Sequence, residues 1–207
     1  MYIPEYHRVE DRRVALAFMQ ANPFAILCST TADGPFATHL PILAVEVDGQ
    51  IQLRGHVAKA NPHWKCIEDE KESLVIFHGP HAYVSPSLYK ARDSVPTWNY
   101  AAIHVYGKGT FVTDEARLDE LLKELIARFD SQYAEQWPSL SQQYRTRLLQ
   151  HIVGFELTAT RVEAKFKLSQ NRTRTDQESV IQALGSSSDS TVTAVAALMK
   201  QQGLGRL

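Results

Sequence analysis

The sequence predicts a mainly β protein with peripheral helices, an α+β fold organised around a small barrel of antiparallel strands. About six segments are rich in β-branched and aromatic residues, and turn signals separate them at short intervals. Peripheral helical patterns accompany them. This arrangement favours a small β-barrel over a sheet assembled from βαβ units.

Proline, glycine and asparagine delimit the elements of the first half. Asn22-Pro23 ends the first helical pattern, because the residue before a proline disfavours the helical conformation. Asp48-Gly49 is a hairpin signal, and Asn61-Pro62 is a helix start. The expected order is a helix over 11–21, strands over 24–28, 37–47 and 51–53, a helix from 61, and strands over 73–77 and 82–84, with Gly79-Pro80 interrupting the last two.

The second half contains the longest strand pattern and the clearest helix. The strand over 96–112 includes Gly107 and Gly109, which indicate a bulge or a close backbone approach. Next come a core-packing helix over 118–129, a helical stretch over 140–149, a strand over 152–167, a helix from a capping box at 175–178 to Gly185, a linker over 186–188 and a helix over 189–202. We therefore expect one domain over 1–184, followed by a linker and C-terminal helix over 185–207.

The bulk composition is that of an ordinary soluble globular protein, with 44% hydrophobic and 22% charged residues. Lys and Arg (22) nearly balance Asp and Glu (23), so no general basic field attracts nucleic acid. Cys28 and Cys66 offer no disulfide framework and indicate reduced thiols. The N-terminus lacks a signal-peptide pattern, and no run reaches the ~18 apolar residues of a membrane span. A cytoplasmic protein without membrane contact is expected.

No established catalytic motif is present: the sequence lacks a catalytic triad motif, a Walker loop and G-x-G-x-x-G. The eight histidines show no His-x-x-x-His spacing, and His78-Gly79-Pro80-His81 lies on a broken strand without cysteine pairs. His104, inside the longest strand, is interpreted as a core or interface histidine. We therefore predict neither catalytic residues nor a metal site.

A first candidate site follows the strand over 51–53. Arg54, His56 and Lys59 lie close together just before the helix start at Asn61. Cations delivered to a helix N-terminus favour an anion such as a phosphate. The alternative is a solvated turn with an ordinary helix cap.

Two further clusters come later in the chain. Trp98, Asn99 and Tyr100 combine flat apolar surface with an amide, which suits a planar heteroaromatic ligand unless both aromatics are plain core. The segment 165–172 places three cations and several uncharged polar residues at a strand end. This is more hydrogen-bonding capacity than a routine edge needs, and it indicates a ligand or interface role.

Together with shorter pieces, these clusters resemble the PaiB family of FMN-binding negative transcriptional regulators, within the split-barrel flavin-binding superfamily. The matching pieces span residues 1 to about 184. They are Met1 to Pro4, His39 to Pro41, Gly55 to Trp64, Ile76 to Pro86, Val95 to Tyr100, His104 to Gly107, Ile152 to Phe155 and Lys167 to Arg172.

The resemblance implies a six-stranded antiparallel split β-barrel that forms a homodimer with FMN at the subunit interface. A cation beside the N1/C2 carbonyl end of the ring would tune the flavin potential. The implied contacts are Arg54, His56, Lys59 and Asn61 for the phosphate, His39, Leu40, Trp98, Asn99 and Tyr100 for the isoalloxazine ring, and Lys167, Ser169, Gln170, Asn171 and Arg172 from across the interface.

Three functions follow from this resemblance. The first is a flavin-binding transcriptional regulator, although no helix-turn-helix is evident and direct DNA contact has little support. The second is an NAD(P)H-dependent flavin oxidoreductase acting on a small acceptor, for which the flavin supplies the chemistry. The third is a haem-binding split-barrel protein.

Overall fold

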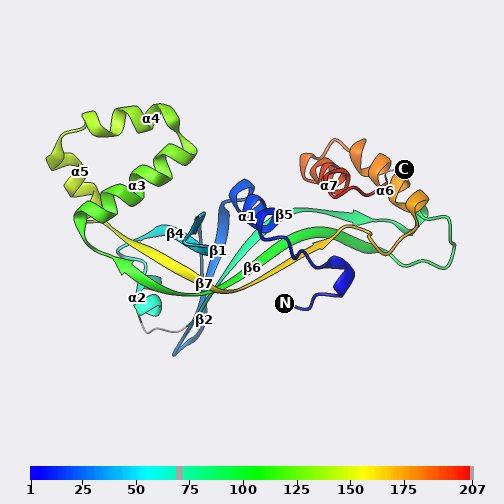
Figure 1. Cartoon of the computed structure of the whole chain (residues 1–207), viewed down its shortest axis with the longest axis horizontal. Coiled ribbons are helices and arrows are strands. Elements are labelled where there is room, and N and C mark those ends of the chain that lie inside the picture. Colours follow the sequence, from blue (N-terminus) through cyan, green and yellow to red (C-terminus); the bar gives the residue numbers. More distant parts are fainter. Residues whose placement is uncertain (69–71, 206–207) are drawn as a thin grey trace. The chain divides into compact units, whose positions relative to one another are not determined.

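The computed structural model of the chain describes residues 1–68 and 72–205 and has a mixed α+β fold. Seven antiparallel strands form one sheet in the order β2-β1-β5-β6-β7-β4-β3. Figure 1 shows β5, β6 and β7 as long strands. The expected class is confirmed, and the expected count of six strands is wrong. The strands are β1 (Phe24–Thr31), β2 (Gly34–Pro41), β3 (Leu43–Val47), β4 (Gln50–Ala58), β5 (Ser73–Val84), β6 (Thr97–Val112) and β7 (Ile152–Lys167), and the helices are α1 (Arg12–Ala21), α2 (His63–Glu68), α3 (Glu115–Phe129), α4 (Ser131–Gln136), α5 (Gln142–Leu149), α6 (Arg174–Gly185) and α7 (Ser190–Gln201).

The chain packs as two compact units. Unit 1 consists of Met1–Ala15, His78–Ile103 and Glu163–Leu207, and unit 2 consists of Leu16–Phe77 and His104–Val162. Strands β5, β6 and β7 each begin in one unit and continue into the other. Helices α6 and α7 belong to the same unit.

The seventh strand arises because the segment expected as one strand over 37–47 is broken at Ile42. Strands β2 and β3 stand at opposite ends of the hydrogen-bonded order, yet only Ile42 separates them in sequence. Laid flat at a spacing of ~4.8 Å, seven strands would put the end strands about 29 Å apart. Cα atoms two residues apart are separated by at most about 7 Å. The sheet in unit 2 therefore curls until its end strands meet at Ile42, as a barrel requires.

Strand β5 is continuous through Gly79 and Pro80, where an interruption was expected. Its register with β1 covers only Leu74 to Ile76. Beyond that stretch β5 has β6 as its neighbour, and a proline is tolerated where no second strand needs its N–H.

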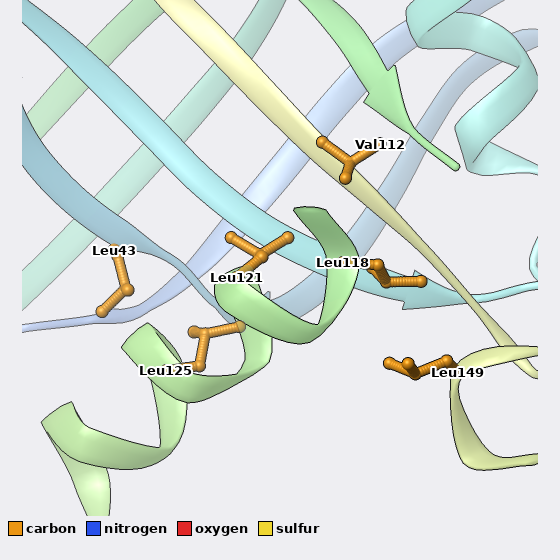
Figure 2. Packing of buried hydrophobic residues seen from close by; sticks show 6 residues of the cluster. All are labelled: Leu43, Val112, Leu118, Leu121, Leu125 and Leu149. Carbon is orange, nitrogen blue, oxygen red and sulfur yellow. The ribbon is translucent and has the colours of Figure 1, made fainter. Parts of the chain in front are cut away.

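Helix α3 covers one face of β4 and β7 in unit 2. Leu118, Leu121 and Leu125 extend from it into an apolar cluster (Figure 2). A Cβ atom on Gly154 of β7 would lie 2.8 Å from Leu121 and 2.9 Å from Leu118, so a glycine is needed for this close packing. The helix expected over 118–129 is confirmed, and Leu118, Leu121 and Leu125 of its apolar stripe are buried, whereas Phe129 at its end is exposed.

In unit 1, helices α6 and α7 pack on each other through buried Val180, Leu184, Val195 and Met199. Met199 also reaches Asn99 of β6, so the helices contact the face of β6 that carries Asn99. Side chains alternate along a strand, which places Trp98 and Tyr100 on the other face. We call that other face, formed by His81, Tyr83, Trp98 and Tyr100, the open face.

Candidate functional site

Two of the residues predicted to bind phosphate lie on the strand face that α3 covers. The Arg54 guanidinium lies 2.8 Å from the Glu124 carboxylate of α3 and 3.0 Å from the Gln52 amide oxygen. His56 is two residues further along β4, so it shares the face of Arg54, and it pairs with Gly154 under α3. Burial lowers the pKa of His56, and its buried Nδ1 atom has no hydrogen-bond partner among the described residues.

The other two predicted phosphate ligands lie in the turn between β4 and α2. Lys59 is exposed and borders a cavity of about 240 Å³ that Trp64, Leu118 and Thr146 also line. The backbone of the turn is held firmly: the Lys59 N–H donates to the His151 carbonyl at 2.8 Å, and the Trp64 indole donates to the Lys59 carbonyl at 3.1 Å. The Lys59 ammonium is therefore the free group of a fixed turn.

Asn61 uses its side chain within the protein. Its Oδ1 accepts from the His63 backbone N–H at 3.0 Å, and its Nδ2 donates to the Thr38 hydroxyl at 3.1 Å. The predicted helix cap is thus confirmed, while the phosphate role stays a prediction.

His63, which the sequence analysis did not single out, is fully buried beside this turn. Its Nδ1 lies 2.8 Å from the Thr38 hydroxyl and its Nε2 lies 3.0 Å from the Ser29 hydroxyl. Ser29 in turn lies 2.8 Å from the Ser73 hydroxyl. Burial lowers the pKa of His63 to about 4, so the ring is neutral at physiological pH. The position of His63 directly after Asn61-Pro62 was the available signal.

The residues predicted to contact the ring from β2 differ in exposure. His39 is exposed, and its ring centre lies 6.5 Å from that of Phe24, an exposed aromatic residue on β1. Leu40 is buried. Unit 2 therefore offers His39, and not Leu40, to a ligand at its surface.

The open face of unit 1 carries an exposed aromatic cluster. Trp98 is 53% exposed, and its ring centre lies 6.1 Å from that of His81 and 5.9 Å from that of Tyr83. His81 and Tyr83 alternate along β5, and that spacing was the signal available in the sequence. An exposed cluster of large rings marks a ligand or partner surface.

Three cations of unit 1 lie beside aromatic residues. Lys167 donates hydrogen bonds to the Thr97 hydroxyl and the Trp98 carbonyl. Lys165 is buried, with its ammonium 5.3 Å from the centre of the Tyr100 ring, and the Arg172 guanidinium lies 4.1 Å from the centre of the Tyr89 ring. None of the three cations forms an ion pair with a carboxylate in the described part of the chain. Burial lowers the pKa of Lys167, and the charges of Lys165 and Arg172 lower it further.

The remaining predicted residues serve the interior or the turn after β7. The Asn99 amide donates to the Ser169 hydroxyl at 2.9 Å, and both residues are buried. Gln170 Oε1 accepts from the Leu168 N–H at 2.7 Å and lies 2.8 Å from His7 Nδ1, while Asn171 is exposed. Asn99 and Ser169 are thus brought together, and their side chains form a hydrogen bond with each other.

Comparison with known proteins decides the family. The family model described as "Putative FMN-binding domain" matches residues 1–161. The chain belongs to this FMN-binding family. It is also 37% identical over 207 residues to the protease synthase and sporulation protein PAI 2 of Bacillus subtilis (strain 168), with 98% of each chain covered, which confirms the resemblance to the PaiB family. A protein of Emericella nidulans, AN0679, is 28% identical over 246 residues, again with 98% of each chain covered.

Solved structures of flavin proteins share the fold. The flavocytochrome Anf3 from Azotobacter vinelandii superposes with a TM-score of 0.62 at 16% identity, covering 83% of this chain and 73% of its own. The FAD and haem binding protein from Mycobacterium smegmatis gives 0.60 at 14% identity, covering 78% and 73%. These likenesses support the expected fold class.

Membership of the FMN-binding family confirms FMN as the expected cofactor. The residues present fit it: FMN has a dianionic phosphate and a planar ring, and the structure offers the free Lys59 ammonium and the exposed Trp98 ring beside Lys167. Cys28 and Cys66 are free thiols. Within residues 1–68 and 72–205, no three histidine, cysteine or carboxylate side chains gather as a metal site, and no helix has the length and apolar character needed to cross a membrane.

Proposed function

We propose that the chain is an FMN-binding regulator of the PaiB type and that two copies share each bound FMN. The observation that carries this proposal is the open face of unit 1, where Trp98 is half exposed beside Lys167, a cation that forms no ion pair with a described carboxylate. A planar ring with an electron-rich edge is the ligand that suits such a face.

The isoalloxazine ring is assigned to the side of Trp98 and Tyr100, with Lys167 at its edge. The bound flavin supplies electron transfer, and a neighbouring positive charge favours its reduced, anionic form. Lys167 is suited to this task because its ammonium is fixed by the Trp98 carbonyl and the Thr97 hydroxyl. His39 of β2 is assigned to the surface of unit 2 that meets the ring.

The phosphate is assigned to Lys59 and the fixed turn around it. Arg54 is assigned to α3 instead, because its guanidinium already holds Glu124 and Gln52. Riboflavin lacks the phosphate, so Lys59→Ala should weaken FMN binding about tenfold and leave riboflavin binding unchanged. Fluorescence titration with both flavins measures this, and an equal loss for both would contradict the assignment.

Sharing of the site between two copies has a specific test. Dimers mixed from Lys59→Ala and Trp98→Ala chains keep one intact site if Lys59 of one copy and Trp98 of the other complete it. If one chain supplied both residues, no site in the mixed dimer would be intact. Differently tagged chains, co-purified and titrated with FMN, should therefore bind about half the wild-type amount with wild-type affinity, whereas each parent variant alone binds weakly.

The regulatory part of the proposal acts through the flavin. Helices α6 and α7 bury their apolar residues against each other, and α7 contains one basic residue, Lys200. Such a pair does not offer the basic recognition helix that reads DNA. We expect no DNA shift at near-physiological salt from the protein alone, and we expect target gene expression to change when Trp98→Ala replaces the wild type in cells. A salt-resistant shift would assign direct DNA binding instead.

A second candidate function is electron transfer from a reduced nicotinamide to a small acceptor. Lys167 beside Trp98 favours it, because a positive charge there stabilises a reduced flavin. Anaerobic addition of NADH or NADPH to the FMN-loaded protein should then bleach the flavin absorption. If neither nicotinamide bleaches the flavin, the electron-transfer function is contradicted and the regulator function remains. A Soret band on haemin titration would favour the haem alternative.

A further inference from the structure

We infer that His63 and Thr38 are positioning residues for the anion-binding turn, holding Asn61 and, through it, the backbone that carries Lys59. The inference rests on the proposed phosphate site at Lys59 and adds two residues that touch no ligand themselves.

The observation behind it is a continuous row of hydrogen-bonded side chains from four elements. It runs from Asn61 to Thr38 on β2, to His63, to Ser29 on β1 and to Ser73 on β5, with separations of 3.1, 2.8, 3.0 and 2.8 Å. Three of these side chains, Thr38, Ser29 and Ser73, lie on one wall of the barrel, since β2, β1 and β5 are neighbours in the sheet, and His63 of α2 joins them.

The row has a direction. The Asn61 amide can only donate to Thr38, so the Thr38 hydroxyl is free to donate to Nδ1 of His63. A neutral imidazole that accepts at Nδ1 carries its proton on Nε2 and donates to Ser29, whose hydroxyl donates to Ser73. Each hydroxyl between the ends then accepts once and donates once. In this arrangement every group of the row has a hydrogen-bond partner, and the row holds Asn61.

Asn61 transmits this order to the turn. Its Oδ1 accepts from the His63 backbone, its own N–H donates to the Ala58 carbonyl at 2.8 Å, and the Lys59 N–H is tied to His151. The backbone on both sides of Lys59 is therefore fixed by Asn61 and His151. A cation on a preorganised turn loses less conformational freedom when it binds a phosphate, and the affinity is correspondingly higher.

Thr38→Val tests the inference, because it removes one hydroxyl and keeps the shape of a strand residue. It leaves Asn61 Nδ2 and His63 Nδ1 without their partner and frees the turn. We expect FMN affinity to fall about five- to tenfold and riboflavin affinity to stay unchanged, with Thr38→Ser restoring FMN binding. The matched control is Thr31→Val, which removes a β1 hydroxyl that donates to the Gly34 carbonyl at 2.7 Å, away from the row.

The outcomes separate this inference from the proposed function. If Lys59→Ala weakens FMN binding selectively and Thr38→Val does not, the positioning role is wrong and the phosphate site stands. If Thr38→Val weakens both flavins equally, or Thr38→Ser restores nothing, the row only supports the fold and the inference is overturned. If Lys59→Ala changes neither flavin, the phosphate site is wrong and the inference falls with it.

Discussion

The Arg54 guanidinium forms an ion pair with Glu124 of α3 at 2.8 Å, and the two side chains are 16% and 34% exposed. Glu156 of β7 lies 3.7 Å from the same guanidinium, and Arg117 of α3 pairs with both carboxylates. The group that the sequence offers as a phosphate ligand is therefore the centre of a network that fastens α3 to β4 and β7.

Arg54→Met should accordingly destabilise the fold and leave FMN binding unchanged. It leaves two partly buried carboxylates with fewer partners, for a cost of about 1–3 kcal/mol in the free energy of unfolding. Urea unfolding measures the loss, and FMN titration of the folded variant should match the wild type. Arg13→Ala breaks an exposed ion pair with Asp11 and should change neither quantity. If Arg54→Met weakens FMN binding more than riboflavin binding, Arg54 is a phosphate ligand after all.

The buried imidazole of His63 makes stability depend on pH. Its pKa is about 4 in the folded protein, below the ordinary value of 6.5, so the unfolded chain takes up the proton first as the pH falls. The contribution of the neutral ring to the free energy of unfolding is complete above pH 6.5 and is lost between pH 6.5 and 4. Between pH 7 and 5 the loss is about 2 kcal/mol. Urea unfolding across this range should show that the free energy of unfolding declines less steeply with falling pH in His63→Gln than in the wild type. Equal declines in the two proteins would contradict the burial of a neutral ring.

The sequence predicted most elements because their local signals agreed with their environments. The leucine repeat of α3 is buried at the expected positions, and Asn61 caps as its type indicates. A sequence signal failed where two neighbouring residues could each serve as the N-cap of one helix. The helix expected to open at the capping box from Thr175 begins at Arg174, because the Thr173 hydroxyl accepts from the Asp176 N–H at 3.3 Å. The strand break at Ile42 directly follows Pro41, which cannot donate to a sheet ladder, and the strand expected over 37–47 ran through that signal.

The residue types of the candidate site could be predicted from the sequence, but the strand faces to which their side chains point could be predicted much less well. Arg54, His56 and Lys59 are neighbours in sequence, yet the alternation of β4 turns the first two toward α3 and leaves the third beyond the strand end. Asn99 stands between Trp98 and Tyr100, and alternation turns it toward Met199. Which face a helix will cover depends on tertiary packing, and no spacing within the strand reveals it.

Gly107 of β6 is predicted to be intolerant of any side chain. A Cβ atom there would lie 2.7 Å from the Thr158 carbonyl oxygen of β7, and backbone cannot move aside as a flexible side chain can. This close approach confirms the expectation from the strand glycines. Gly107→Ala should lower the free energy of unfolding by about 1–3 kcal/mol. Gly185→Ala, whose nearest contact is Ala196 at 3.8 Å, should have little effect, and comparable losses in both would contradict the packing of β6 on β7.

Lys167 should raise the reduction potential of bound FMN. Its ammonium is fixed beside Trp98, and its charge favours the anionic reduced flavin over the neutral oxidised one. Removing that charge in Lys167→Gln should lower the two-electron potential by about 30 mV or more, since 30 mV corresponds to about 1.4 kcal/mol. A spectroscopic redox titration of the FMN-loaded protein measures the shift. Arg174→Gln is the matched control, because Arg174 is an exposed cation of the same unit that already pairs with Glu178. If Lys167→Gln and Arg174→Gln shift the potential equally, only the overall charge matters, and the ring does not lie beside Lys167.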